Sequence, residues 1–105
     1  MNALTELQNL LSRTKSEIKA ATVSFGHGYY EEDEQPPFNL KVSHSTDDLK
    51  AFEEYLNRNY DNGYGGQELH GIIWFEDGTW AERGEYDGSE WWEHRKLPAI
   101  PKELL

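Results

Sequence analysis

Hydrophobic residues near the start of the chain recur with the spacing of an amphipathic helix. The stripe consists of Leu4, Leu7, Leu11 and Ile18. Because residues three, four or seven positions apart share one side of a helix, the pattern predicts a helix over residues 3–20 whose apolar side packs on the rest of the fold. Asn2 or Thr5 can cap its start, since both side chains accept hydrogen bonds from free backbone N–H groups.

A second stripe predicts a second helix, over residues 46–60. Its apolar side consists of Leu49, Phe52 and Leu56. Ser45 or Thr46 is a suitable N-cap, and the two aspartates that follow suit the positive end of a helix. Asn62-Gly63 supplies a stop signal after it.

Between the helices, residues 21–43 alternate in the manner of two β-strands. Residues 22–25 form the first strand and residues 38–42 the second, and we expect the two to pair. An acidic loop over residues 31–37 separates them, because consecutive carboxylates cannot pack together and prolines end regular structure.

The C-terminal half predicts a three-stranded antiparallel meander over residues 70–97. Two Asp-Gly pairs lie between runs rich in β-branched and aromatic residues, which is the strongest short-range signal of a hairpin. The expected strands cover residues 71–75, 79–86 and 90–97. A two-residue loop at the first Asp-Gly would place Phe75 opposite Trp80.

The predicted order is α-β-β-α-β-β-β in one domain over residues 1–105. This is an α+β fold, with one antiparallel sheet and both helices packed on one of its faces. An aromatic side chain should therefore stay partly exposed on the other face. Residues 98–105 are expected to be an extended tail that lays Leu97 and Ile100 back on the domain, although the segment 95–101 also matches a proline-rich ligand pattern.

The formal charge of −10 restricts the classes of partner. Most of the excess acid lies in the loop and the meander, and a field of this sign repels phosphate backbones and anionic membranes but attracts basic proteins. Direct binding to nucleic acid or membrane is therefore disfavoured, although acid can also serve solubility alone. The chain contains no cysteine and no apolar run of membrane-spanning length, and we expect a cytoplasmic protein.

Candidate chemistry is sparse. Glu82 and Glu93 lie near tryptophans and could form the pair of carboxylates that a glycosidase uses. Two observations argue against this interpretation. Acidic residues occupy exposed positions on every predicted strand, and so thin a fold offers no deep cleft for a substrate. The four histidines are dispersed, without the spacing that would place two on one face for a metal. We expect a protein that is not an enzyme and that uses neither metal nor cofactor.

The two hairpin arms, GIIWFEDGTW and EYDGSEWWEH, belong to a small, acidic, cysteine-free α+β chain. In size, charge and layout it resembles small inhibitors encoded by phages and mobile elements, of the anti-CRISPR or DNA-mimic type. The resemblance implies a monomer or homodimer in the host cytoplasm, whose carboxylates block a basic nucleic-acid-binding surface of a host defence protein or enzyme. The residues implied in partner binding are Glu31, Glu32, Asp33, Glu34, Glu82, Glu85, Glu90, Trp91, Trp92 and Glu93.

Two other functions fit the same sequence. An immunity protein would use the acidic surface to neutralise a basic toxin. A small carbohydrate-binding module would use exposed tryptophans, for which Trp80, Trp91 and Trp92 are the candidates, because a flat aromatic face binds a sugar ring without a cleft.

Overall fold

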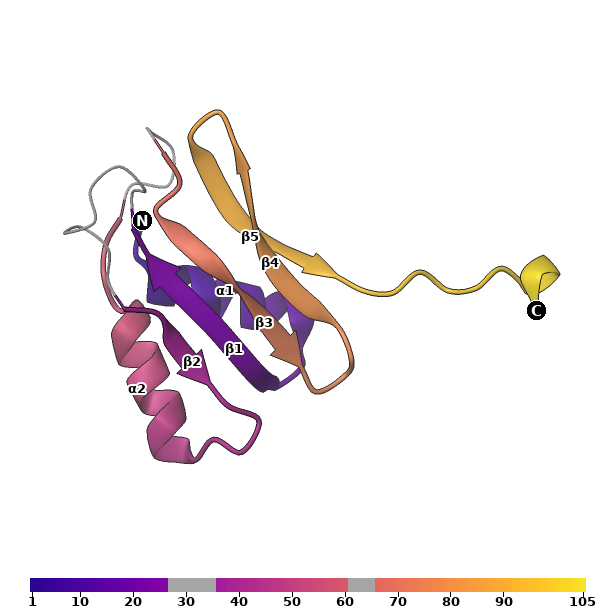
Figure 1. Cartoon of the computed structure of the whole chain (residues 1–105), viewed down its shortest axis with the longest axis horizontal. Coiled ribbons are helices and arrows are strands. Elements are labelled where there is room, and N and C mark those ends of the chain that lie inside the picture. The colour runs from indigo at the N-terminus through magenta and orange to yellow at the C-terminus, as the bar shows by residue number, and fades with distance from the viewer. Residues whose placement is uncertain (27–35, 61–65) are drawn as a thin grey trace.

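The computed structural model describes residues 1–26, 36–60 and 66–105, and the fold is α+β (Figure 1). In this part of the chain two α-helices accompany one antiparallel sheet, whose spatial order is β2-β1-β3-β4-β5. The elements are α1 (Ala3–Thr14), β1 (Ile18–Phe25), β2 (Phe38–Leu40), α2 (Thr46–Leu56), β3 (Leu69–Phe75), β4 (Trp80–Tyr86), β5 (Ser89–Arg95) and the short 3-10 helix η2 (Lys102–Leu104). The predicted acidic loop falls mostly outside the described residues.

Helix α1 begins as predicted but ends earlier. The side chain of Asn2 accepts hydrogen bonds from two backbone N–H groups of the first turn. The helix stops at Thr14, and Lys15 follows in a left-handed conformation with a φ of 57°. Ile18, which the helical stripe includes, instead starts β1 opposite Phe75, so the predicted extension of the helix is wrong. Strand pairing buries Ile18, and this gain outweighs its local fit to a helix.

Helix α2 likewise starts at the predicted cap and ends before the predicted limit. The Ser45 hydroxyl accepts from the Asp48 N–H while the Asp48 carboxylate accepts from the Ser45 N–H, which is a capping box. After Leu56 the chain becomes extended and pairs with the N-terminal residues, as the Tyr60 N–H donates to the Met1 carbonyl at 2.8 Å. The predicted helix over these last residues is therefore wrong.

Strand β1 pairs on both of its sides. Val23 lies opposite Phe38 of β2, which confirms the predicted pairing, and opposite Gly71 of β3 on its other side. A Cβ atom at Gly71 would lie 2.3 Å from the backbone oxygen of Thr22. Only glycine allows the two backbones to approach this closely.

The predicted hairpin between β4 and β5 turns through a two-residue loop at Asp87-Gly88. Asp87 and Gly88 both have positive φ angles, 51° and 85°, as a type I′ turn requires. Tyr86 and Ser89 close the loop as the last paired residues.

The hairpin between β3 and β4 differs from its prediction by one residue. Its loop covers residues 76–78, because the Phe75 N–H donates to the Thr79 carbonyl, and Gly78 has a φ of 87°. Trp74 consequently lies opposite Trp80, so the predicted pairing of Phe75 with Trp80 is wrong. The shift by one residue moves both tryptophans to the same face of the sheet.

The hydrophobic core lies between the helices and one face of the sheet. Both helices contribute buried side chains to a single cluster with the inward-facing residues of the strands. The largest fully buried members are Phe52, Phe75, Leu7, Leu10, Leu56, Leu69, Ile73 and Val23. We call this side of the sheet the covered face. The opposite side, which no described helix covers, is the open face.

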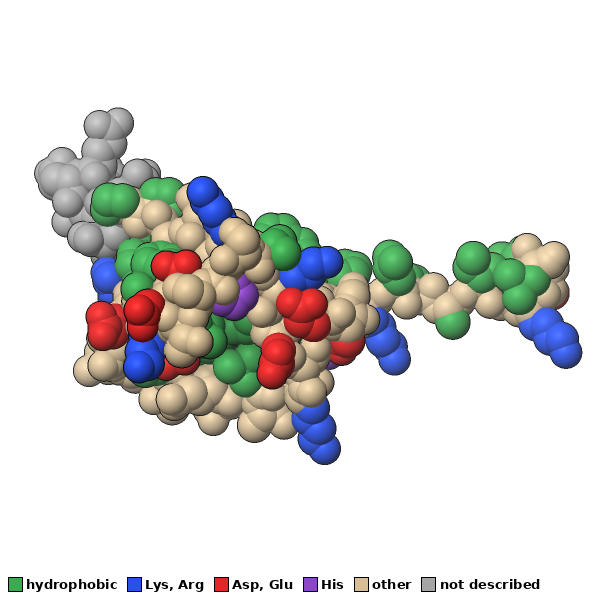
Figure 2. All heavy atoms as spheres, turned by 90° about the horizontal axis from the view of Figure 1, so that it is seen from below, with side chains coloured by type: hydrophobic (Ala, Val, Ile, Leu, Met, Phe, Trp, Pro, Cys, Tyr) green, Lys and Arg blue, Asp and Glu red, His purple; other side chains and the backbone are tan. Residues whose placement is uncertain are grey.

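The last ten residues, 96–105, project from the domain as a tail (Figures 1 and 2). Leu97 and Ile100 are 76% and 65% exposed, so the prediction that they pack back on the domain is wrong. Pro98 and Pro101 explain the difference, because proline and the residue before it favour extended backbone and resist a reversal of the chain.

Candidate functional site

The open face gathers aromatic and charged side chains from three neighbouring strands. Strand alternation places there Ile72, Trp74, Trp80, Glu82, Trp91, Glu93 and Arg95. They form cross-strand rows, since Trp80 is paired with Trp74 on one side and with Arg95 on the other. Neighbours in such a row lie within side-chain contact, so the face is one continuous surface.

Trp74 is the most accessible tryptophan of this surface. Its side chain is 42% exposed, whereas Trp80 and Trp91 are partly buried. The exposed Trp74 confirms the prediction that an aromatic residue remains uncovered on one face of the sheet. A half-exposed tryptophan offers a large apolar contact area to a partner.

Trp91 lies against the backbone of β4. A Cβ atom added at Gly84, its cross-strand neighbour, would lie 2.8 Å from both Cε2 and Nε1 of the indole. The indole N–H donates to Glu93 at 3.1 Å. Glycine at position 84 therefore lets the ring cover the strand, and Glu93 holds the ring in that orientation.

One arginine joins the two carboxylates of the open face. Arg95 forms ion pairs with Glu82 through Nε and with Glu93 through Nη2. The side chain of Arg95 is 50% exposed, and the carboxylates are 39% and 36% exposed. Water and salt screen such pairs, so they hold the face only weakly and leave the carboxylates accessible.

The covered face of the same hairpin holds a second cluster, which we call the buried network. It consists of Glu6, Tyr60, Arg83 and Glu90. Arg83 Nη1 lies 3.1 Å from Glu6 and Nη2 lies 2.8 Å from Glu90, and the Arg83 side chain is only 2% exposed. The Tyr60 hydroxyl donates to Glu6 and accepts from Arg83. The network thus joins α1, the segment after α2, β4 and β5.

Glu90 has a structural task within this network. Its side chain is fully buried, and its carboxylate accepts the backbone N–H groups of Glu68 at 2.8 Å and Leu69 at 3.0 Å. The paired register between β3 and β4 runs from Ile72 to Trp74, so these N–H groups lie beyond it. Glu90 therefore continues the hydrogen bonding where the two strands separate.

Aromatic rings surround the guanidinium of Arg83. Its Cζ atom lies 5.0 Å from the ring centre of Trp92 and 5.9 Å from that of Tyr60. Burial lowers the pKa of Arg83 while Glu6 and Glu90 raise it, and the net direction is upward. Burial also raises the pKa of the Tyr60 hydroxyl, and its hydrogen bond to Glu6 raises it further.

The structure separates the residues that the sequence suggested for partner binding. Glu82, Trp91 and Glu93 lie together on the open face. Glu85 pairs with Glu90 and so belongs to the other side of the sheet, where it is exposed and accepts from the Gly88 N–H. Trp92 and Glu90 are buried on the covered face, where neither side chain can meet a partner. Glu31, Glu32, Asp33 and Glu34 lie outside the described residues.

Sequence reasoning missed Trp74 as the exposed aromatic and missed the buried network altogether. Trp74 is exposed because the helices cover the face of β3 that carries Ile73 and Phe75, and the register of the first hairpin places Trp80 on the same face as Trp74. A signal for the network did exist, because Arg83 lies two residues after Ala81 and therefore shares its inward phase on the strand. A charged residue at an inward position needs a buried partner.

In comparison with known proteins, no family model, no curated protein and no solved structure matches the chain. Within residues 1–26, 36–60 and 66–105, no group of three or more histidine or acidic side chains is placed to hold a metal ion. No helix of that part of the chain has the length and apolarity needed to cross a membrane.

Proposed function

We propose that this protein is a non-catalytic binding protein whose open face engages a basic surface of another protein. The partner we infer is a nucleic-acid-binding protein or nuclease, which the bound protein inhibits by occupying the surface meant for nucleic acid. The observation that carries the proposal is Trp74, half-exposed on a sheet face that no described helix covers and that also presents the accessible carboxylates of Glu82 and Glu93.

Trp74 would act as the anchor of this interface. Tryptophan and arginine dominate the binding energy of protein interfaces, and an aromatic centre with a charged rim is their usual layout. Ile72 and Trp80 extend the apolar centre, while Glu82 and Glu93 form the rim. A partner with arginine or lysine around an apolar site would complement both parts.

Charge supports a basic partner and argues against nucleic acid itself. The whole chain carries −10, which attracts a positive surface and speeds the encounter with it. Arg95 already pairs with Glu82 and Glu93, but these exposed pairs contribute little stability and a partner's guanidinium can replace them.

The test is capture of a binding protein on the immobilised chain, followed by elution with a salt gradient and by displacement with DNA. We expect a basic nucleic-acid-binding protein that salt releases and that DNA displaces. Trp74→Ala should weaken its binding by about 2 kcal/mol, the scale of an interface hot spot. Val42→Ala is the matched control, because Val42 is also exposed but lies after β2, away from the open face.

Two results would overturn the proposal. One is a captured partner that binds the Trp74→Ala variant as tightly as the original chain. The other is a partner that resists salt and ignores DNA, since acid would then serve only solubility.

The pairing of Trp74 with Trp80 favours one further candidate, a carbohydrate-binding module. Two neighbouring indoles on an uncovered sheet can offer a platform on which a sugar ring stacks. Titration with oligosaccharides distinguishes the two functions, because a saturable change in tryptophan fluorescence that Trp74→Ala abolishes would favour the sugar platform.

A further inference from the structure

The tail combines exposed hydrophobic side chains with positive charge. Besides Leu97 and Ile100, Leu104 and Leu105 are 72% and 86% exposed. Figure 2 shows hydrophobic side chains along the whole projection. Lys96 and Lys102 are exposed on the same segment and outnumber its one acidic side chain, Glu103, in a protein whose net charge is −10. So dense an apolar segment is typical of a contact surface rather than of a solvated end.

The backbone of the tail is preorganised for binding. Pro101 has φ and ψ of −58° and 145°, which are polyproline II angles. A polyproline II helix has three residues per turn, so the same angles continued back along the tail would place Leu97 and Ile100 on one edge. Pro98 and Pro101 restrict the chain before binding, which reduces the entropy lost when a partner holds it.

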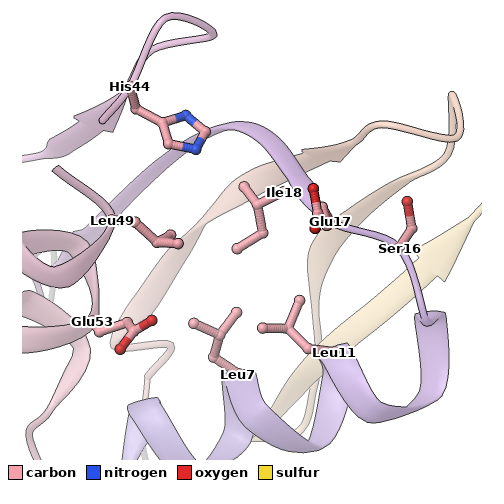
Figure 3. A pocket seen from close by; sticks show the side chains of 8 residues that line it. All are labelled: Leu7, Leu11, Ser16, Glu17, Ile18, His44, Leu49 and Glu53. Carbon is pink, nitrogen blue, oxygen red and sulfur yellow. The ribbon is translucent and has the colours of Figure 1, made fainter. Parts of the chain in front are cut away.

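A cavity of suitable chemistry lies between the helices and the start of β1 (Figure 3). Its volume is about 330 Å³, and Leu7, Leu11, Ile18 and Leu49 form its apolar wall. Ser16, Glu17, His44 and Glu53 complete the lining. Glu17 and Glu53 are exposed, so an apolar cavity with an acidic rim faces solvent.

The cavity and the root of the tail lie at the same end of the domain. The Asp77 N–H donates to the Ser16 hydroxyl at 3.3 Å, which joins the cavity rim to the β3–β4 loop. Thr79 at the end of that loop is hydrogen-bonded to His94 at 2.8 Å. Arg95 follows His94 directly and leads into the tail.

We propose that the tail of one copy docks in this cavity of a second copy, with reciprocal exchange producing a two-fold dimer. Leu97 and Ile100 enter the apolar cavity, while the tail lysines lie near the acidic rim. Because each copy offers both halves of the contact at one end, two copies facing each other close the assembly, as a two-fold dimer requires.

A second copy fits better than the cavity of the same chain. The part of the tail before η2, residues 96–101, can reach about 20 Å away from the domain when extended. Reaching its own cavity would require the tail to reverse direction just after β5. Proline and the residue before each proline disfavour such a reversal over residues 97–101. The dimer also leaves the open face free, so this proposal does not rest on the proposed function.

The first experiment measures the mass of the full chain by sedimentation at increasing concentration. We expect a shift from 12.2 kDa to twice that mass. Ile100→Asp should raise the dimer dissociation constant at least tenfold, whereas Ala99→Asp, which adds the same charge beside it, should have a smaller effect. Glu53→Lys should weaken the dimer more than Glu54→Lys does, because only Glu53 lines the cavity.

A disulfide crosslink then identifies whether the tail occupies the cavity of its own chain or that of a second copy. The sequence has no cysteine, so Ala99→Cys and Glu53→Cys can be made in separate proteins and mixed under oxidising conditions. A disulfide between the two proteins supports exchange between copies. A disulfide that forms only when both substitutions share one chain shows that the tail folds onto its own domain and overturns the proposal.

Two further outcomes also overturn it. One is a chain that remains at 12.2 kDa up to millimolar concentration. The other is a dimer that Ile100→Asp and Glu53→Lys leave unchanged, which would place the contact elsewhere. Both variants alter exposed side chains, and circular dichroism verifies that they fold.

Discussion

The β4–β5 hairpin carries one arginine between two carboxylates on each of its faces, in opposite surroundings. On the covered face Arg83 joins Glu6 and Glu90, and its side chain is 2% exposed. On the open face Arg95 joins Glu82 and Glu93, and its side chain is 50% exposed. The same kinds of group thus have different energetic consequences, because the Arg83 cluster has lost its contact with water and the Arg95 cluster keeps it.

Burial turns the first cluster into a structural requirement. Removing water from a charge is costly, and attraction between the partners compensates only while every partner is present. In the exposed cluster each charge keeps its water when a partner is lost. The buried network therefore stabilises the fold, while the charged groups of the exposed cluster can exchange their ion-pair partners.

The largest expected effect is that of Arg83→Met. The variant leaves Glu6 and Glu90 buried without their cation, so we expect the free energy of unfolding to fall by about 3–5 kcal/mol. Denaturant unfolding followed by circular dichroism measures it, with Arg95→Met as the matched control. Equal losses in the two variants would contradict the contrast between the faces.

Glu90→Gln should have the next largest effect. An amide cannot accept hydrogen bonds from the Leu69 and Glu68 N–H groups at both of its ends, and it removes the charge opposite Arg83. We expect a loss of about 2–3 kcal/mol. Hydrogen exchange should also show faster exchange of these two amides. Glu93→Gln on the open face is the control and should change neither quantity appreciably.

Tyr60→Phe should cost about 1–2 kcal/mol at neutral pH, because Glu6 loses a hydrogen-bond donor. The pKa of Tyr60 is raised in the folded protein, so above about pH 10 the unfolded chain releases this proton first. The stability that Tyr60 contributes is therefore present below that pH and declines above it. Unfolding measured from pH 7 to pH 11 should show the difference between the two proteins shrinking. A difference that grows would contradict the raised pKa.

Arg95→Met should have the smallest effect, within about 1 kcal/mol. Any loss of stability that this substitution causes at low salt should be absent at high salt, since salt screens exposed charges. Unfolding in 0.1 M and about 1 M sodium chloride tests this. A loss of stability that persists in high salt would show that Arg95 stabilises the fold through packing of its side chain rather than through its ion pairs.

Local sequence signals predicted most of the helices and strands of this fold. The pairing of strands decided their exact ends and their register. Asn2 and Ser45 are caps as predicted, since capping depends on a few adjacent residues. The two Asp-Gly pairs illustrate the limit, because both lie in the predicted hairpins but Asp87-Gly88 forms a two-residue loop while Gly78 ends a three-residue one. The same dipeptide permits both loops.

The candidate site was less predictable because it depends on register. One residue of shift in the first hairpin decided that Trp80 would share the open face with Trp74. Likewise, Ile18 suits both a helical stripe and a strand, and only pairing with β3 settles its place. The buried network unites residues distant in sequence, so no local window contains it.

The distribution of tryptophans over the two faces also gives the molecule two separate optical reporters. Trp92 is 3% exposed in the core, so its emission should shift to longer wavelength only when the fold opens. Trp74 already meets water, so its emission should shift to shorter wavelength when something covers the open face. Keeping only Trp92 or only Trp74, with the other three tryptophans replaced by phenylalanine, would allow folding and binding to be followed independently by fluorescence, without any added label.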